Sequence, residues 1–217
     1  MKAISLITRK TDTCRDTFRR YYENTHCRLA IRNFPYQRYT RNYLKSDALG
    51  LDFDCISEFQ MASDFDSSNI MHSRSRKLLE DDEHLFMQPE KIRVARADET
   101  ILLDRTCAES PVSSSRYALL FKRCDMEQSE FCQRVEAAAQ VMSWDIGTLQ
   151  KLSLDMLKPL AGERFPFDAI LWMQTVTACM THLLPAGVTP GIIGAVAVHT
   201  HATSRNELQQ GFVKYLP

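Results

Sequence analysis

The sequence predicts an α+β fold built from two consecutive halves, each with the element order βαββαβ. Short runs in which apolar and polar residues alternate are typical of strands that bury one face. Between them lie stretches whose apolar residues recur every three or four positions, as in helices that pack on a sheet. This order of elements occurs once before a stretch rich in Ser and small residues at 106–115, and again after it.

The first half is expected to contain four strands and two helices. The alternating, Ile-, Leu- and Tyr-rich runs predict strands at 3–10, 36–44, 53–61 and 92–103. Apolar periodicity predicts helices at 13–30 and 63–79. Thr13 and Asp16 resemble a capping box at the start of the first helix, with Asp in place of Glu.

The second half repeats this order. Strands are expected at 116–123, 148–157, 167–175 and 194–202, and helices at 125–142 and 177–184. We therefore divide the chain into a first half at 1–105, a linker at 106–115 and a second half at 116–217. A βαββαβ unit is a ferredoxin-like arrangement with helices on one face of its sheet. Because the other face must also be buried, we expect an intrachain dimeric α+β-barrel with a ligand pocket between the sheets.

Composition indicates a soluble globular protein. With 27 basic and 27 acidic residues among 217, the net charge is zero, which argues against nucleic acid or an anionic membrane as the partner. The seven cysteines are scattered and form no CxxC pair, so neither structural zinc nor a disulfide framework is expected. Reduced cysteines fit a cytoplasmic location.

One long stretch, 169–204, contains no Asp, Glu, Lys or Arg. Pro and Gly residues interrupt it, so we interpret it as buried strands and a short helix rather than a membrane span. The apolar run at the N-terminus is too short for a signal peptide. The expected partner is a small hydrophobic or aromatic molecule, and the expected assembly is a monomer (a pseudo-dimer) or a homodimer.

The most informative helix is the first one. At about 100° per residue, Phe18, Tyr22, His26 and Leu29 fall on one narrow stripe. His26 is therefore a titratable imidazole on an apolar face, where burial and neighbouring groups can tune a base for proton transfer. The alternative is a core histidine that hydrogen-bonds to a nearby carbonyl.

The second half offers a comparison for this helix. Aligning Phe131 with Phe18 places Ala139 at the position of His26. The packing positions stay apolar while the imidazole is lost. An apolar residue would therefore suffice for packing, which favours a single active site in the first half.

Other residues of the first half are candidates for the same site. Tyr39, on the following strand, could donate a hydrogen bond to a developing oxyanion, or be an ordinary strand aromatic. Tyr22 could line the pocket or pack. Arg41 could bind a carboxylate, although a solvated surface arginine is the simpler interpretation. Glu58 could orient His26 or act as a base, or be a polar residue at a sheet edge.

His199 and His201 share one face of the last expected strand with Ala195 and Ala197, which leaves room for a ligand. An HxH pair can bind a metal, but no third ligand is identifiable, so we expect no metal site. No Gly-rich phosphate loop occurs, and we expect no nucleotide or other cofactor.

Together these residues support a family resemblance. The residues that carry it are Thr13, Phe18, Tyr22, His26, Leu29, Ala30, Tyr39 and Asn42, with the later segments Asp82-Glu83 and Phe86-Met87-Gln88-Pro89. Over roughly 1–104 the chain resembles an EthD-like domain of the dimeric α+β-barrel superfamily. That superfamily includes polyketide cyclases and dehydratases, muconolactone-type isomerases, cofactor-free monooxygenases and some haem proteins. In methylmuconolactone isomerases a helix imidazole and a strand tyrosine are functional, and by position these resemble His26 and Tyr39.

The expected function is therefore a cofactor-independent acid/base enzyme, a dehydratase, cyclase, lyase or isomerase acting on a small oxygenated molecule. His26 would move the proton, Tyr39 would stabilise the oxyanion and His199 would assist. Tyr22, Arg41, Glu58 and His201 would contact the substrate. The alternatives are a cofactor-free monooxygenase of an aromatic substrate, a non-catalytic small-ligand-binding protein and, more remotely, a haem protein.

Overall fold

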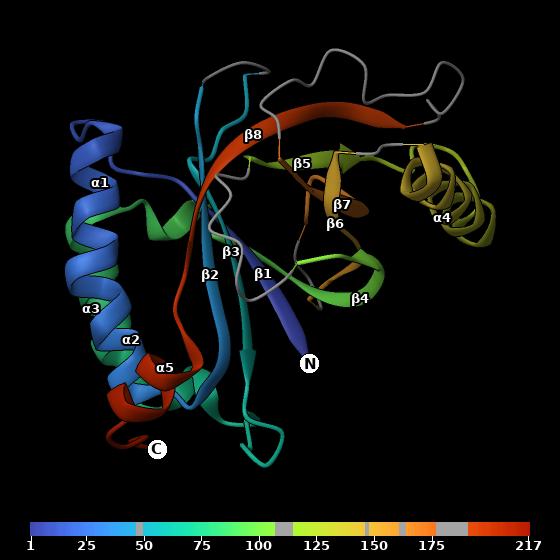
Figure 1. Cartoon of the computed structure of the whole chain (residues 1–217). Helices are drawn as coiled ribbons and strands as arrows, with labels where there is room; N and C mark the ends of the chain where they lie inside the picture. The colour runs from blue at the N-terminus through green and yellow to red at the C-terminus, as the bar shows by residue number, and fades with distance from the viewer. Residues whose placement is uncertain (47–49, 107–114, 146–147, 161–163, 177–190) are drawn as a thin grey trace. The chain divides into compact units, whose positions relative to one another are not determined.

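The computed structural model describes residues 1–46, 50–106, 115–145, 148–160, 164–176 and 191–217, which form two compact units (Figure 1). Unit 1 consists of Met1–Tyr43, Gly50–Ala95 and Thr200–Pro217. Unit 2 consists of Leu44–Leu49 and Arg96–His199. The end of the chain thus belongs to the same unit as its beginning.

The sheet of unit 1 is antiparallel. Its strands β1 (Lys2–Ile7) and β2 (Tyr36–Leu44) both pair with β3 (Cys55–Met61), which lies between them. Side chains alternate across this sheet, so Tyr39, Arg41 and Tyr43 point to one face of β2. The helices of unit 1 cover that face (Figure 1).

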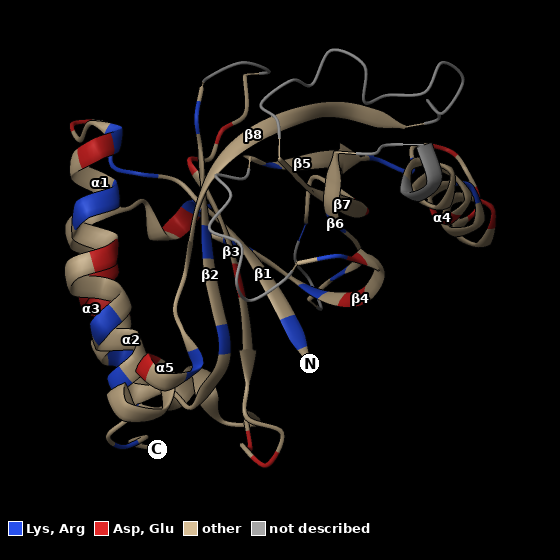
Figure 2. Ribbon diagram, in the orientation of Figure 1, with Lys and Arg blue, Asp and Glu red and all other residues tan. Residues whose placement is uncertain are grey.

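The first helix is a continuous helix with a π-helical turn in its middle. It comprises α1 (Arg15–Tyr21), the π turn η1 (Tyr22–His26) and α2 (Cys27–Asn33). It confirms the predicted helix and extends it slightly. Figure 2 shows acidic and basic residues interspersed along it.

The predicted capping box at the start of this helix is wrong. The N-cap is Cys14, which makes no side-chain cap hydrogen bond. The Thr13 hydroxyl donates instead to Asp12 Oδ1 at 3.4 Å, because the chain is still in a turn at this point.

The second helix begins later than predicted. The structure has a 3₁₀ turn at Ile70–His72 and then α3 at Arg74–Phe86, so 63–73 contains no α-helical residue. Ser73 is the N-cap, and its hydroxyl accepts a hydrogen bond from the backbone N–H of Arg76 at 3.0 Å. The small polar residues before Ser73 favour turns, which delays the helix and brings the acidic segment at 80–83 into it.

Three strands contribute residues to both units: β2, whose last residue Leu44 belongs to unit 2, β4 (Arg93–Asp104), after the 3₁₀ turn η3 (Pro89–Lys91), and β8 (Ile192–Ala202). A further helix, α5 (Arg205–Gly211), follows β8 and was not predicted. Its start is a capping box formed by Ser204 and Glu207.

Unit 2 has its own antiparallel pairing, in which β7 (Ala169–Thr175) lies between β5 (Ser115–Phe121) and β6 (Leu149–Pro159). β8 pairs with the other edge of β5. The helix α4 (Gln128–Asp145) buries Phe131, Val135 and Ala139 with the residues of this sheet.

The α+β class is confirmed, whereas the structural equivalence of two ferredoxin-like halves stays a prediction. Most of the predicted linker at 106–115, and the predicted helix at 177–184, lie outside the described residues. Among the helices that the structure does describe, none is both long and apolar enough to cross a lipid bilayer.

Candidate active site

His26 ends the π turn and is held by a carboxylate from α3. Its Nδ1 lies 2.8 Å from Oδ2 of Asp82, and the imidazole is buried, with the residue 4% exposed. The other carboxylate oxygen of Asp82 accepts a hydrogen bond from the Tyr21 hydroxyl at 2.8 Å. Asp82 therefore connects two residues of the first helix, on either side of Tyr22.

This geometry selects one tautomer of the neutral imidazole. A proton on Nδ1 can be donated to Asp82, which leaves the lone pair on Nε2. No described residue hydrogen-bonds to Nε2. An imidazole held in this way by a carboxylate is the arrangement in which histidine acts as a general base through Nε2.

The carboxylate of Asp82 is in its charged form at neutral pH. Burial raises its pKa, but the hydrogen bonds from His26 and Tyr21 favour the anion and lower the pKa below the usual value. Tyr21 shows the reverse effect. Burial and the adjacent Asp82 charge raise the pKa of Tyr21 to about 12, so its hydroxyl remains a donor.

The π turn brings several candidate site residues inward at once. Tyr22 and His26 are buried, and Glu23, between them, reaches Arg41 on the sheet. A π turn has a wider ring than an α turn and is frequently found at functional sites. The aromatic rings of Tyr22 and Phe86 pack against the imidazole, with centroids 5.1 and 5.0 Å away.

The tyrosine whose ring packs against this imidazole, Tyr22, is hydrogen-bonded to a second tyrosine, Tyr39. Tyr39 Oη and Tyr22 Oη are 3.3 Å apart, and both side chains are buried. Burial raises the pKa of both phenols well above the usual value, so both are neutral hydrogen-bond donors. Of the two, Tyr22 has its ring packed against His26, and Tyr39 is linked to His26 through it.

Arg41 is not a solvated surface residue, and that interpretation was wrong. It is 3% exposed and forms a bidentate ion pair with Glu23, with Nε–Oε1 at 3.0 Å and Nη2–Oε2 at 2.5 Å. Its Nη1 donates to the hydroxyl of Thr203, and Tyr43 donates to the same Glu23 at 2.6 Å. The helix supplies a counter-charge that makes burial of the guanidinium possible.

Glu58 lies away from His26, on the sheet face opposite the helices, because its neighbours Cys55 and Phe59, at odd positions of β3, pack on the helix side. It is buried in an ion pair with Lys2, whose Nζ is 2.7 Å from Oε2, and accepts a hydrogen bond from Asn42 at 2.8 Å. The prediction that it orients His26 was wrong, because Asp82 has that position. It is not at a sheet edge either, because β3 is the central strand.

The two histidines of β8 differ in their surroundings. His201, in unit 1, has Nδ1 3.8 Å from a carboxylate oxygen of Glu23, and its ring is 6.0 Å from that of Tyr43. His199 belongs to unit 2 and is exposed. An assisting role for His199 stays a prediction.

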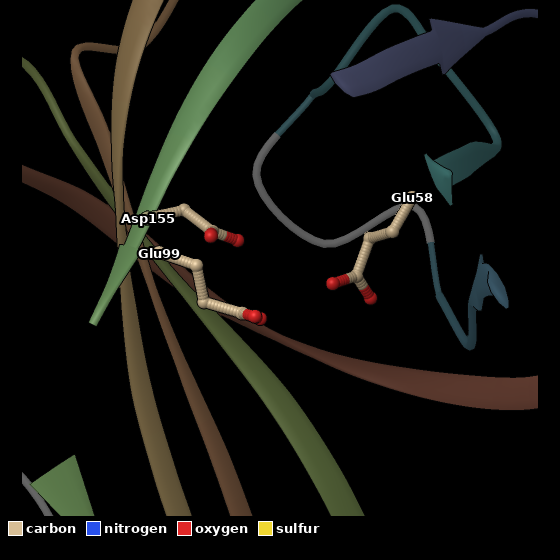
Figure 3. A group of neighbouring side chains, drawn as sticks. All are labelled: Glu58, Glu99 and Asp155. Atoms are coloured by element: carbon tan, nitrogen blue, oxygen red, sulfur yellow. The ribbon is translucent and has the colours of Figure 1, made fainter. Parts of the chain in front are cut away.

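Unit 2 contains a carboxylate pair of its own. Glu99 on β4 and Asp155 on β6 have carboxylate oxygens within 4.8 Å of each other, and Figure 3 shows both side chains pointing the same way. Trp172 Nε1 donates to Asp155 Oδ2 at 2.7 Å, and Asp155 is fully buried. Two hard oxygen donors are suited to a divalent cation, but two carboxylates alone do not make a cation site.

Sequence reasoning placed His26 and the tyrosines in the site but missed Asp82, Glu23 and Tyr21. Asp82 was visible as a pattern: Leu79, Asp82 and Phe86 recur at helical spacing, so a carboxylate interrupts an apolar stripe. This is the same signal that singled out His26. The predicted helix ended at residue 79, and Asp82 therefore fell outside it.

Solved structures share the α+β fold of this chain. An anthrone oxidase-like protein aligns with a TM-score of 0.60 and 12% identity, over 93% of this chain and 92% of its own. A predicted monooxygenase from Fusobacterium nucleatum subsp. nucleatum aligns with a TM-score of 0.52 and 11% identity, over 94% and 92%. A predicted chlorite dismutase aligns with a TM-score of 0.52 and 6% identity, over 96% and 97%.

Residues 10–90 match the model of the EthD domain family. The match includes both His26 and Asp82. It confirms the resemblance drawn from the sequence. No curated protein sequence matches the chain.

Proposed function

We propose that the protein is an acid/base enzyme in which His26, oriented by Asp82, removes a proton from a small oxygenated hydrophobic or aromatic molecule. The observation that supports this most strongly is the 2.8 Å contact between His26 Nδ1 and Asp82. A histidine needed only for packing would not require a charged partner inside the helical layer.

In the proposed step, Nε2 accepts a proton from a C–H or O–H group that a neighbouring carbonyl or aromatic ring makes acidic. The proton moves to Nε2, and the electron pair of the broken bond remains on the substrate as an enolate or phenolate. The imidazolium that forms is stabilised by the Asp82 carboxylate. The protein thus supplies the base itself, and this step requires no cofactor.

The hydroxyl pair of Tyr22 and Tyr39 is suited to the developing oxyanion. Both are neutral donors in a water-poor environment, where hydrogen bonds to a forming charge are strongest. The ring of Tyr22 packs against the imidazole, so Tyr22 is the more direct donor. Tyr39 donates a hydrogen bond to the Tyr22 hydroxyl and so makes that hydroxyl a stronger donor. Arg41 would have to exchange its Glu23 partner to bind a substrate carboxylate.

What happens to the anion distinguishes two candidate reactions. In a dehydratase, cyclase, lyase or isomerase, the imidazolium returns the proton to a leaving hydroxyl or to another carbon. In a monooxygenase, the anion gives electrons to molecular oxygen. The second reaction is supported by the names of two neighbours, an anthrone oxidase-like protein and a predicted monooxygenase.

The proton step is tested before the final product is known. A panel of small phenols, anthrones, lactones and β-dicarbonyl compounds is incubated with the protein in D₂O, and loss of the acidic C–H signal is followed by NMR. An oxygen electrode follows the same mixtures. Exchange without oxygen uptake indicates acid/base chemistry, and exchange with oxygen uptake indicates a monooxygenase.

Two variants assign the activity to the dyad. In His26→Gln and Asp82→Asn, exchange should fall strongly, while His84→Ala, an exposed histidine on α3, should match the wild type. Circular dichroism establishes that the variants are folded. Undiminished exchange in folded His26→Gln would refute the proposal. A compound that binds tightly and returns unexchanged would instead indicate a ligand-binding protein.

A further inference from the structure

Tyr21 and His26 are five residues apart in the first helix, yet they contact the same two side chains of α3. The Tyr21 hydroxyl donates to Oδ1 of Asp82, and Nδ1 of His26 lies beside Oδ2, both at 2.8 Å. The ring centroid of Phe86, four residues after Asp82, is 4.9 Å from that of Tyr21 and 5.0 Å from that of the imidazole. Tyr21 and His26 therefore lie on the same face of the helix.

A regular α-helix would not place these two side chains together. Each residue of an α-helix turns the chain by about 100°, so residues five apart point about 140° away from each other. In a π turn the hydrogen bond runs instead from an N–H to the carbonyl five residues earlier. Here the backbone N–H of Cys27 donates to the carbonyl oxygen of Tyr22. Residues five apart across this turn are thus about one full turn apart.

The burial pattern of the helix shows the same five-residue step. In the core cluster of unit 1, Phe18 and Tyr22 are four residues apart, and so are Cys27 and Ile31. Between these two pairs the step from Tyr22 to Cys27 is five residues. The π turn therefore accommodates one extra residue without interrupting the buried face, and this extra residue brings His26 into line with Tyr21.

We propose that Tyr21 is a positioning residue for the base His26, and that the π turn is the feature that places it there. Tyr21 holds one oxygen of Asp82 so that the other oxygen stays aligned with Nδ1. It acts through Asp82 and not on the substrate. The catalytic consequence rests on the proposed function, whereas the geometry is testable in the resting protein.

The two hydrogen bonds to Asp82 explain why a second donor matters. A carboxylate held at one oxygen can turn about its Cβ–Cγ bond, and donors on both oxygens prevent this. The hydrogen bonds from His26 and Tyr21 also lower the pKa of Asp82. Asp82 therefore accepts the hydrogen bond from Nδ1 without taking the proton, and it remains the anion that stabilises an imidazolium.

The first measurement tests the π turn. In protein labelled with ¹³C and ¹⁵N, couplings across hydrogen bonds identify the carbonyl group that accepts from each backbone N–H. The amide nitrogen of Cys27 should couple with the carbonyl carbon of Tyr22. A coupling with the carbonyl carbon of Glu23, four residues before Cys27, would show an α turn and would overturn the proposal.

The second measurement tests Tyr21 in the resting protein. Tyr21→Phe keeps the ring and removes the hydroxyl, so the Nδ1 proton of His26 should exchange with water about tenfold faster. Ser75→Ala is the matched control, because the buried Ser75 hydroxyl joins the same two helices through Asn33 at 3.2 Å, away from Asp82. It should leave this exchange as in the wild type. An unchanged rate in folded Tyr21→Phe, or an equal acceleration in Ser75→Ala, would overturn the proposal.

The third measurement connects Tyr21 to the reaction. With a compound from the panel that the wild type deprotonates, Tyr21→Phe should lower kcat by about tenfold and leave KM nearly unchanged. An unchanged kcat would overturn the positioning role. If the wild type deprotonated none of the compounds, the proposed function alone would fail. The two measurements on the resting protein would still decide whether Tyr21 positions the imidazole through Asp82.

Discussion

Asp82 of α3 lies 2.8 Å from Nδ1 of His26, which ends the π turn of the first helix. This contact joins two residues that are 56 positions apart in the chain and lie on different helices. It defines both the orientation and the protonation pattern of the imidazole. Most of the testable consequences of the structure follow from it.

The first prediction concerns the pH dependence of stability. The pKa of Asp82 is lower in the folded state than in the unfolded state, where it is about 4. The Asp82 carboxylate therefore stabilises the fold above the unfolded-state pKa, and this stabilisation is lost as the pH falls through the folded-state pKa. Asp82→Asn should lower the free energy of unfolding at neutral pH by roughly 1–3 kcal/mol. The difference from wild type should shrink in acid. Urea unfolding across pH measures it.

A matched variant makes this result specific. Asp64→Asn removes a carboxylate from an exposed position before α3 and should leave both the stability and its pH profile nearly unchanged. If Asp82→Asn lowered the free energy of unfolding by the same amount at every pH, the result would contradict this prediction. It would mean that the fold does not stabilise the anionic form of Asp82.

The second prediction concerns Tyr21. Its pKa is raised to about 12 by burial and by the Asp82 charge. Since the raised value belongs to the folded state, Tyr21 contributes stability that is lost as pH rises from about 10 through 12. In Asp82→Asn the ionisation of Tyr21 should move toward its ordinary value. Ultraviolet titration at the phenolate band, with Tyr21→Phe subtracted, detects the shift.

The third prediction concerns the ion pair between Arg41 and Glu23. Removing one partner of a buried pair leaves an uncompensated charge, so Arg41→Met should cost about 3–5 kcal/mol. The double variant Arg41→Met/Glu23→Gln should recover part of that loss. Arg134→Met, which breaks an exposed pair with Glu130, is the control and should cost less than about 1 kcal/mol. Equal losses for Arg41→Met and Arg134→Met would contradict the described burial of Arg41.

The fourth prediction divides the roles of the tyrosines once a substrate is known. Tyr22→Phe should reduce kcat by about 10²-fold, the usual cost of losing an oxyanion donor. Tyr39→Phe should have a smaller effect, because Tyr39 reaches the imidazole only through Tyr22. Steady-state kinetics of both variants measure the difference. A larger loss in Tyr39→Phe would reverse the two roles.

Much of unit 1 was predictable because its signals are local. The spacing of Phe18, Tyr22 and His26 predicted the buried helix face, and alternation predicted β2. The late start of α3 was missed because the Ser73 cap was not weighed against the preceding polar residues. α5 was missed although Ser204 and Glu207 form a recognisable capping box.

The rest depends on contacts between distant segments. Burial of Arg41 follows from its pairing with Glu23, which a helix brings to the sheet, and no local pattern shows it. The π turn likewise is set by packing rather than by helix propensity. To predict Asp82 as the partner of His26, both the bounds of α3 and its rotation about its axis had to be known. The predicted helix ended at residue 79, before Asp82.

The most direct test of the central claim is the protonation state of His26 in the resting protein. In ¹⁵N-histidine-labelled protein, two-bond ¹H–¹⁵N correlations identify which ring nitrogen carries the proton, and His26→Gln assigns the signal. The structure predicts that the neutral ring is protonated at Nδ1 and has a free Nε2, and that Asp82→Asn weakens this preference. A neutral ring protonated at Nε2 would contradict the account, because the nitrogen proposed as the base would already hold a proton.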